Sequence, residues 1–91
     1  MISNIWVFVA DGASLPSGVF REKSLASEWI QKRSLSGILT EYPLDVGVYE
    51  WAIDNGLFTV KYPSQEEASF IGRFTSAYLK HSHFENGEEL S

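Results

Sequence analysis

The stretch Asn4-Ile5-Trp6-Val7-Phe8-Val9-Ala10 is followed at once by Asp11-Gly12. It consists almost entirely of β-branched and aromatic residues, which favour strands, and its large apolar groups alternate onto both faces. Asp-Gly is a turn signal that ends the run at Ala10. The pattern predicts a central, buried strand over Ile5–Ala10.

Two further β-rich segments follow. A loop rich in turn formers, residues 13–18, leads to the short apolar pair Val19-Phe20. A second strand is predicted over Ile38–Tyr42, where Pro43 stops it or marks it as an edge. Gly37 precedes this strand, and we expect it to take a left-handed conformation that ends a helix or turns the chain.

Helical periodicity appears in three places. Residues 23–33 place Leu25, Ala26, Trp29 and Ile30 on one face, which predicts an amphipathic helix. Residues 46–55 fit either a strand or a helix. We favour the helix, in which Asp45 would be the N-cap and Gly56 would follow the end.

The last third of the chain is predicted to be mostly helical. A short strand is expected over 57–61, before Ser64 and Glu67, which have the spacing of a capping box. Apolar residues then recur at helical spacing to about residue 80, although Gly72 weakens this helix. Residues 86–91 are short, polar and acidic, and are expected to form a frayed tail.

Together these elements predict one α+β domain over residues 1–85, in which a small, mostly antiparallel sheet is covered by two or three helices. A chain of 91 residues is too short for two independent cores. The residues expected in the core are Trp6, Phe8, Trp29, Ile30, Ile71 and Phe74.

Composition excludes several classes of protein. Cysteine is absent, which rules out disulfides and thiolate chemistry, and no apolar run approaches the ~18 residues that span a bilayer. No secretory leader is recognisable, so we expect a cytoplasmic protein without a membrane partner. The net charge of −5 would repel a phosphate backbone, which makes nucleic acid a poor partner.

The middle of the chain is an acidic block, because residues 34–60 contain four acids and no lysine or arginine. One interpretation is a solvated face that favours solubility. The functional interpretation is a docking surface for a protein with a basic surface, in which aromatic residues supply anchors. The predicted binding residues are Glu41, Tyr42, Asp45, Tyr49, Glu50 and Asp54.

His81, His83 and Glu85 alternate, so in an extended segment they would share a face and resemble a two-histidine, one-carboxylate metal site. Because they fall where a helix should end, we expect a structural or surface role, with no tightly bound metal and no cofactor. The chain lacks G-x-S-x-G, G-x-G-x-x-G and P-loop motifs, so no catalytic residue is assigned.

The chain contains these motifs in order: Ser17-Gly18-Val19-Phe20, Leu35-Ser36-Gly37 with Thr40 and Tyr42-Pro43, Gly47-Val48-Tyr49-Glu50-Trp51-Ala52-Ile53 with Gly56, Phe70-Ile71-Gly72 and His81-x-His83. In these motifs the chain resembles a family of small uncharacterised bacterial proteins, a domain of unknown function. The resemblance implies no activity and no catalytic residue. The family pattern has tyrosine after the second histidine, where this chain has Phe84.

Three classes of function follow. The first is a small acidic protein-binding domain, of the kind an immunity protein uses to cover a basic partner. The second is a small metal-dependent or histidine-using enzyme that works through His81, His83 and Glu85. The third is a self-associating structural domain, such as a homodimer that buries surplus apolar surface.

Overall fold

The computed structural model describes residues 3–90 and divides them into two compact units. The first, here called the sheet unit, comprises residues 3–44 and 79–90. The second, called the aromatic unit, comprises residues 45–78. The length of the chain predicts one core. Because the chain divides into two units, each unit is described by itself.

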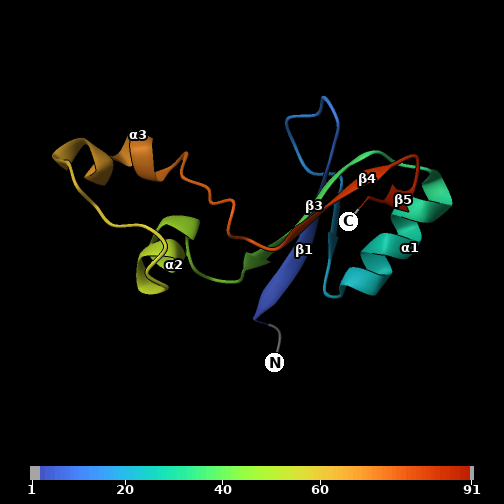
Figure 1. Cartoon of the computed structure of the whole chain (residues 1–91), viewed down its shortest axis with the longest axis horizontal. Coiled ribbons are helices and arrows are strands. Elements are labelled where there is room, and N and C mark those ends of the chain that lie inside the picture. Colours follow the sequence, from blue (N-terminus) through green and yellow to red (C-terminus); the bar gives the residue numbers. More distant parts are fainter. Residues whose placement is uncertain (1–2, 91) are drawn as a thin grey trace. The chain divides into compact units, whose positions relative to one another are not determined.

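The sheet unit contains an antiparallel sheet with the strand order β2-β1-β3-β4-β5 (Figure 1). The strands are β1 (Asn4–Ala10), β2 (Gly18–Phe20), β3 (Gly37–Pro43), β4 (His81–Glu85) and β5 (Glu88–Glu89). The predicted strands at 5–10 and 38–42 are confirmed. β1 is paired on both sides, by β2 and β3, although β3 is the middle strand and Phe8 is the one fully buried residue of β1.

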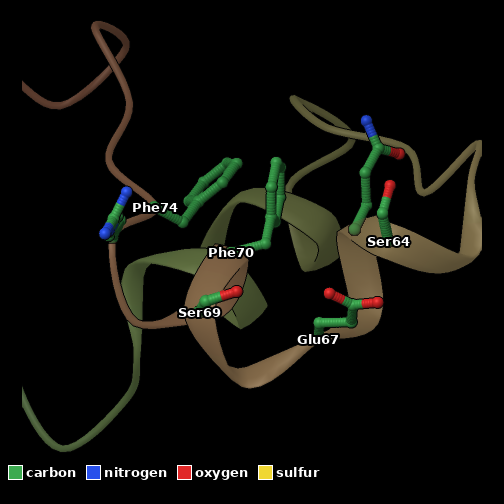
Figure 2. Close-up of a pocket in the computed structure, with 7 residues that line it drawn as sticks. Ser64, Glu67, Ser69, Phe70 and Phe74 are labelled. Carbon is green, nitrogen blue, oxygen red and sulfur yellow. The ribbon is translucent and has the colours of Figure 1, made fainter.

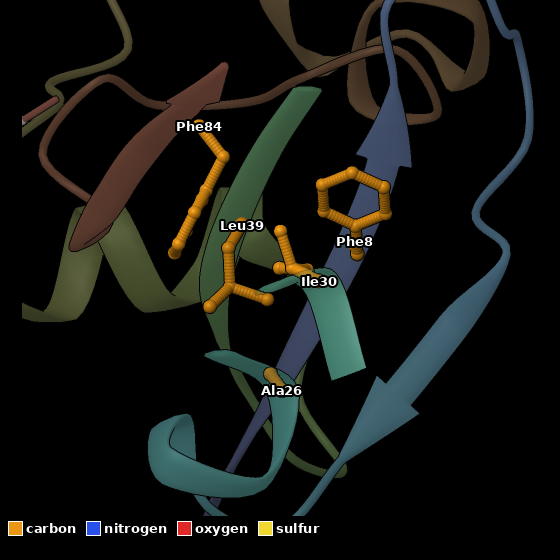
Figure 3. Close-up of a cluster of buried hydrophobic side chains, with 5 residues drawn as sticks. All are labelled: Phe8, Ala26, Ile30, Leu39 and Phe84. Atoms are coloured by element: carbon orange, nitrogen blue, oxygen red, sulfur yellow. The ribbon is translucent and has the colours of Figure 1, made fainter. Parts of the chain in front are cut away.

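One face of this sheet shares a buried cluster with helix α1 (Lys23–Arg33). Phe8 of β1 is directly opposite Leu39 of β3, and both are fully buried. Figure 3 shows these side chains converging with Ala26 and Ile30 of α1 and Phe84 of β4. The predicted helix over 23–33 is therefore confirmed. Of the four positions that the periodicity marked, Ala26 and Ile30 are fully buried, Trp29 is partly buried against the cluster, and Leu25 is exposed.

Helix α1 ends in a different way from the one expected. Ser34, and not Gly37, takes the left-handed conformation, with φ of 54°. Gly37 instead begins β3, where its lack of a side chain matters because a Cβ there would run into the carbonyl oxygen of Val9. The role of Gly37 is therefore close packing within the sheet and not the left-handed turn that was expected.

The frayed tail expected over 86–91 is wrong for residues 86–90, because residues 81–89 form a hairpin, and Ser91 lies outside the described residues. Asn86 and Gly87 have φ of 50° and 88°, as a two-residue type I′ turn requires, and β5 pairs with β4 after them. The backbone N–H of Gly87 donates to the Leu35 carbonyl at 2.8 Å, which ties the turn to the end of α1. Asn-Gly is the strongest short hairpin signal, so the sequence does contain the information.

The aromatic unit contains three short helical segments: α2 (Val48–Asp54), the 3-10 helix η1 (Pro63–Glu66) and α3 (Ala68–Ile71). The preference for helix over 46–55 is confirmed, and Gly56 follows its end with φ of 69°. Asp45 is not the N-cap, because Gly47 occupies that position.

The strand predicted over 57–61 and the helix predicted over 65–80 are both wrong. Residues 57–61 are irregular, and the chain turns at Glu67, which is extended with ψ of 150°. The predicted Ser64–Glu67 capping box does not form; the Gln65 side-chain oxygen instead accepts the backbone N–H groups of Lys61 and Tyr62 at 2.7 and 3.2 Å. These bonds hold the chain in a turn that a continuous helix would exclude.

The predicted core is correct for the sheet unit only. Phe8 and Ile30 are fully buried, and Trp6 and Trp29 are partly buried residues packed against them. Ile71 and Phe74 belong to the aromatic unit and are half-buried there. They are therefore not part of the core that the prediction assigned to them.

Candidate functional site

The six predicted binding residues fall in both units. Glu41 and Tyr42 are half-buried residues of β3, and Glu41 accepts a hydrogen bond from the Asn4 side-chain amide at 3.3 Å. Asp45, Tyr49, Glu50 and Asp54 belong to the aromatic unit. The aromatic unit therefore contains most of the predicted surface.

Tyr49 is a structural residue of the aromatic unit. Its side chain is only 7% exposed, and its hydroxyl donates to the Gln65 carbonyl at 2.8 Å. Its ring packs with those of Phe58, Phe70 and Phe74, and every pair among the four has centroids 4.8–6.3 Å apart. Such distances are typical of favourable aromatic contacts. Tyr49 therefore links α2 to the following segments, and little of its ring is accessible to a partner.

Burial raises the pKa of the Tyr49 phenol above its ordinary value, and the negative charges of Glu66 and Glu50 raise it further. Glu50 lies on α2 and Glu66 on η1, so two carboxylates from different elements act on one hydroxyl. Negative charge thus converges beside the aromatic cluster.

Five exposed carboxylates make the aromatic unit acidic, and we call this set the acidic surface: Asp45, Glu50, Asp54, Glu66 and Glu67. Against them the unit has two bases, Lys61 and Arg73, for a net charge of −3. Within residues 3–90 the only ion pair joins Lys23 to Glu89, in the sheet unit. In the part of the chain that the structure describes, no lysine or arginine is therefore in direct contact with the acidic surface.

Two tyrosines of the aromatic unit are exposed, although the sequence did not mark them as binding residues. Tyr62 is 62% exposed and Tyr78 is 70% exposed, whereas the predicted anchors Tyr42 and Tyr49 are half-buried and buried. Tyr62 stands beside Pro63 in a polar stretch, which was a usable sign of exposure. The exposure of Tyr78 was not predicted, because the helical pattern placed this residue on an inward face.

A hollow of about 590 Å³ opens on the same unit. Figure 2 shows the rings of Phe70 and Phe74 standing beside each other, with Ser64 and Glu67 at one end of the hollow. Arg73 also lines it, so an apolar floor is combined with one carboxylate and one guanidinium. Such a hollow can receive the apolar stem of a long side chain and fix its polar end.

The histidines lie in the sheet unit, on the exposed face of β4. His81, His83 and Glu85 alternate with the buried residues Ser82 and Phe84. The predicted shared face therefore exists, on a strand and not at the end of a helix. Among residues 3–90 no three histidine or carboxylate side chains come together closely enough to hold a metal ion.

The described residues thus define a small α+β protein with an antiparallel sheet, a class that accommodates many functions. The family model for a domain of unknown function, DUF7710, matches residues 5–90, and the chain belongs to that family. Neither a curated protein nor a solved structure matches the chain. None of the helices in the described part of the chain has the length and apolar content needed to cross a bilayer.

Proposed function

We propose that this protein is a binding domain that docks a protein with a basic surface through its aromatic unit. The observation that carries the proposal is the acidic surface, whose five carboxylates have no ion-pair partner among residues 3–90. Unpaired, exposed carboxylates keep their full charge available for a cationic partner. Charge complementarity of this kind speeds encounter and selects among partners.

Support for a specific interface comes from the aromatic cluster, because the charges of Glu50 and Glu66 act on its Tyr49. Four rings in mutual contact hold α2, the segment containing Phe58 and α3 in one arrangement. A surface that is ordered before binding loses less conformational entropy when a partner arrives. The exposed Tyr62 and Tyr78 rings are suitable anchors, because tyrosine is enriched where binding energy is concentrated.

The hollow refines the expected partner. A lysine or arginine of the partner can lay its aliphatic stem on Phe70 and Phe74 while its charge meets Glu67. Arg73 lines the same hollow, so the partner must also present an acceptor opposite that guanidinium. A nucleic-acid-binding protein covered in this way would be inhibited, which is the action of an immunity protein. Glu41 and Tyr42, in the sheet unit, join the interface only where a partner contacts both units.

The test compares two variants that carry the same number of charge changes. Asp45→Asn, Glu50→Gln and Asp54→Asn remove three carboxylates of the acidic surface. Glu22→Gln, Glu28→Gln and Glu85→Gln remove three exposed carboxylates of the sheet unit. Each triple variant has a net charge of −2 in place of −5, so the two differ only in where the charge was lost.

Proteins captured by the immobilised parent are identified by mass spectrometry, and the affinity of the most strongly bound one is measured for all three chains. We expect a basic protein that binds the first variant at least about tenfold more weakly and the second nearly as well as the parent. Equal weakening in both variants would indicate attraction by net charge alone. Unchanged binding in both would exclude the acidic surface as the docking site.

A further inference from the structure

We infer that His81 and His83 form a two-histidine chelating site for a divalent ion of the late first transition row, such as Cu²⁺, Ni²⁺ or Zn²⁺. Both residues lie on β4 with one residue between them. Successive side chains of a strand point to opposite faces, so these two share one face. The intervening Ser82 is 5% exposed and the following Phe84 is 4% exposed, which fixes both imidazoles on the solvent side.

The spacing of the two rings suits a shared ion. Their centroids are 5.8 Å apart. An imidazole nitrogen binds Zn²⁺ at about 2.0–2.1 Å, so a ring centre stands about 3.2 Å from the ion and two ring centres reach at most about 6.4 Å. A tetrahedral angle at the ion corresponds to about 5.2 Å between the centres. The observed 5.8 Å lies between these two values, so the separation of the rings is compatible with one shared ion.

A second contact prepares His81 for this role. Its Nδ1 lies 2.7 Å from the carbonyl oxygen of Leu79. A carbonyl can only accept a hydrogen bond, so Nδ1 carries the proton and the lone pair of the neutral ring is on Nε2. Histidines that ligate metals usually donate their other ring N–H to a backbone carbonyl or a carboxylate, which fixes the ring and its tautomer.

The surroundings define what such a site can hold. Imidazole suits copper, nickel and zinc, whereas Mg²⁺ and Ca²⁺ require several oxygen ligands. Glu85 lies further along the same face, yet no group of three ligands forms within the described part of the chain. The remaining coordination positions are open to water or to a ligand from another molecule. This inference concerns the sheet unit and does not depend on the proposed docking surface.

The experiment is a titration of tag-free protein at pH 7.5 with Cu²⁺, Ni²⁺ and Zn²⁺ separately. Binding is measured by calorimetry and by the NMR signals of the histidine rings. We expect one equivalent to bind, with Cu²⁺ the tightest as the Irving–Williams order requires, and no response to Mg²⁺. Removing either ring by His81→Gln or His83→Gln should weaken binding at least about tenfold, because the chelate is lost. Glu85→Gln is the matched control on the same strand face and should bind as the parent does.

Before metal is added, ring ¹⁵N spectra should show the proton of neutral His81 on Nδ1. A proton on Nε2 would overturn the pre-arranged site. Undiminished binding in the double variant His81→Gln, His83→Gln would place the ion elsewhere. An equal loss of metal affinity in Glu85→Gln and His83→Gln would show that Glu85 is a third ligand, which contradicts the two-histidine site.

Discussion

The two units of this protein are stabilised in different ways. In the sheet unit, Phe8, Ala26, Ile30 and Leu39 are completely buried, and strands far apart in the sequence pair through backbone hydrogen bonds. In the aromatic unit only Tyr49 and Ala52 are buried, and the remaining rings of the cluster are half-buried. Full burial provides most of the hydrophobic stabilisation. The sheet unit therefore supplies stability, while the less buried aromatic unit is expected to open at lower free energy.

The largest expected effect comes from deleting the same ring in each unit. Phe8→Ala should lower the free energy of unfolding of the sheet unit by about 3–5 kcal/mol, because it leaves a cavity beside Leu39 and Trp29. Phe58→Ala removes a half-buried ring and should cost roughly 1–2 kcal/mol in the aromatic unit. Urea unfolding monitored by amide signals of each unit measures both. A larger cost for Phe58→Ala would reverse the comparison.

A smaller effect is expected from adding one methyl group to a glycine of each unit. Gly37→Ala should destabilise the protein by about 1–3 kcal/mol, because the new Cβ would clash with backbone atoms of Val9 and Ala10. Gly72→Ala meets only the Ala68 carbonyl oxygen, at 3.1 Å, in a backbone conformation that alanine adopts. Its effect should stay within about 1 kcal/mol, since the restricted unfolded chain offsets the contact. Thermal unfolding of the two variants gives the difference, and equal shifts would contradict it.

The Tyr49 hydroxyl tests the aromatic unit alone. Tyr49→Phe removes the bond to the Gln65 carbonyl and should cost about 0.5–1.5 kcal/mol, seen as faster amide exchange over residues 45–78. Tyr62→Phe is the matched control, because its hydroxyl belongs to a side chain that is 62% exposed. Equal effects of the two changes would show that the buried hydrogen bond contributes nothing.

The same hydroxyl predicts a pH dependence. The folded-state pKa of Tyr49 is raised, so above the ordinary value of 10.0 the unfolded chain loses this proton first. The contribution of Tyr49 to stability is complete below that pH and is lost as the pH rises through the folded pKa. Tyrosine absorbance and unfolding measured from pH 9 upward should show this loss in the parent and not in Tyr49→Phe.

The smallest expected effect concerns the ion pair of the sheet unit. Lys23 Nζ and Glu89 Oε2 are 2.8 Å apart, and their side chains are 41% and 35% exposed. The hydrogen bond from Lys23, and then that from Ser82, lowers the pKa of Glu89, so its contribution to stability is present above the ordinary carboxyl pKa and is lost as the pH falls through the folded one. Solvent screening limits Glu89→Gln to about 0–1 kcal/mol.

Glu88→Gln is the control for this pair, because Glu88 is an exposed neighbour in β5 with no ion-pair partner among residues 3–90. Both variants are compared at low and high salt by urea unfolding at neutral pH. A loss in Glu88→Gln as large as that in Glu89→Gln would show that net charge, and not the pair with Lys23, produces the effect.

Sequence alone was sufficient wherever a short window contained the whole signal. The strand at Asn4–Ala10 is marked by its β-branched and aromatic residues, and the helix Lys23–Arg33 by its helical periodicity. Residues 46–55 fit a strand or a helix, and the structure decides for the helix Val48–Asp54. The acidic character of the middle segment is equally a property of composition. Even the missed hairpin was specified locally by Asn86-Gly87.

Other features depended on contacts between distant residues, which no local pattern contains. Phe70, Phe74 and Tyr78 have helical spacing, yet the helix α3 ends at Ile71. Phe70 instead packs against Tyr49, and Phe74 packs against Phe58. His83 faces solvent beside His81 because β4 pairs with β3 in a fixed register. His83 is opposite Ile38 and His81 is opposite Thr40, and these partners are 45 and 41 positions apart in the sequence. Strand pairing fixes which side chains share a face, and burial decides which tyrosine remains exposed. Strand pairing and burial both depend on contacts that exist only in the assembled protein, and therefore only the tertiary structure decides them.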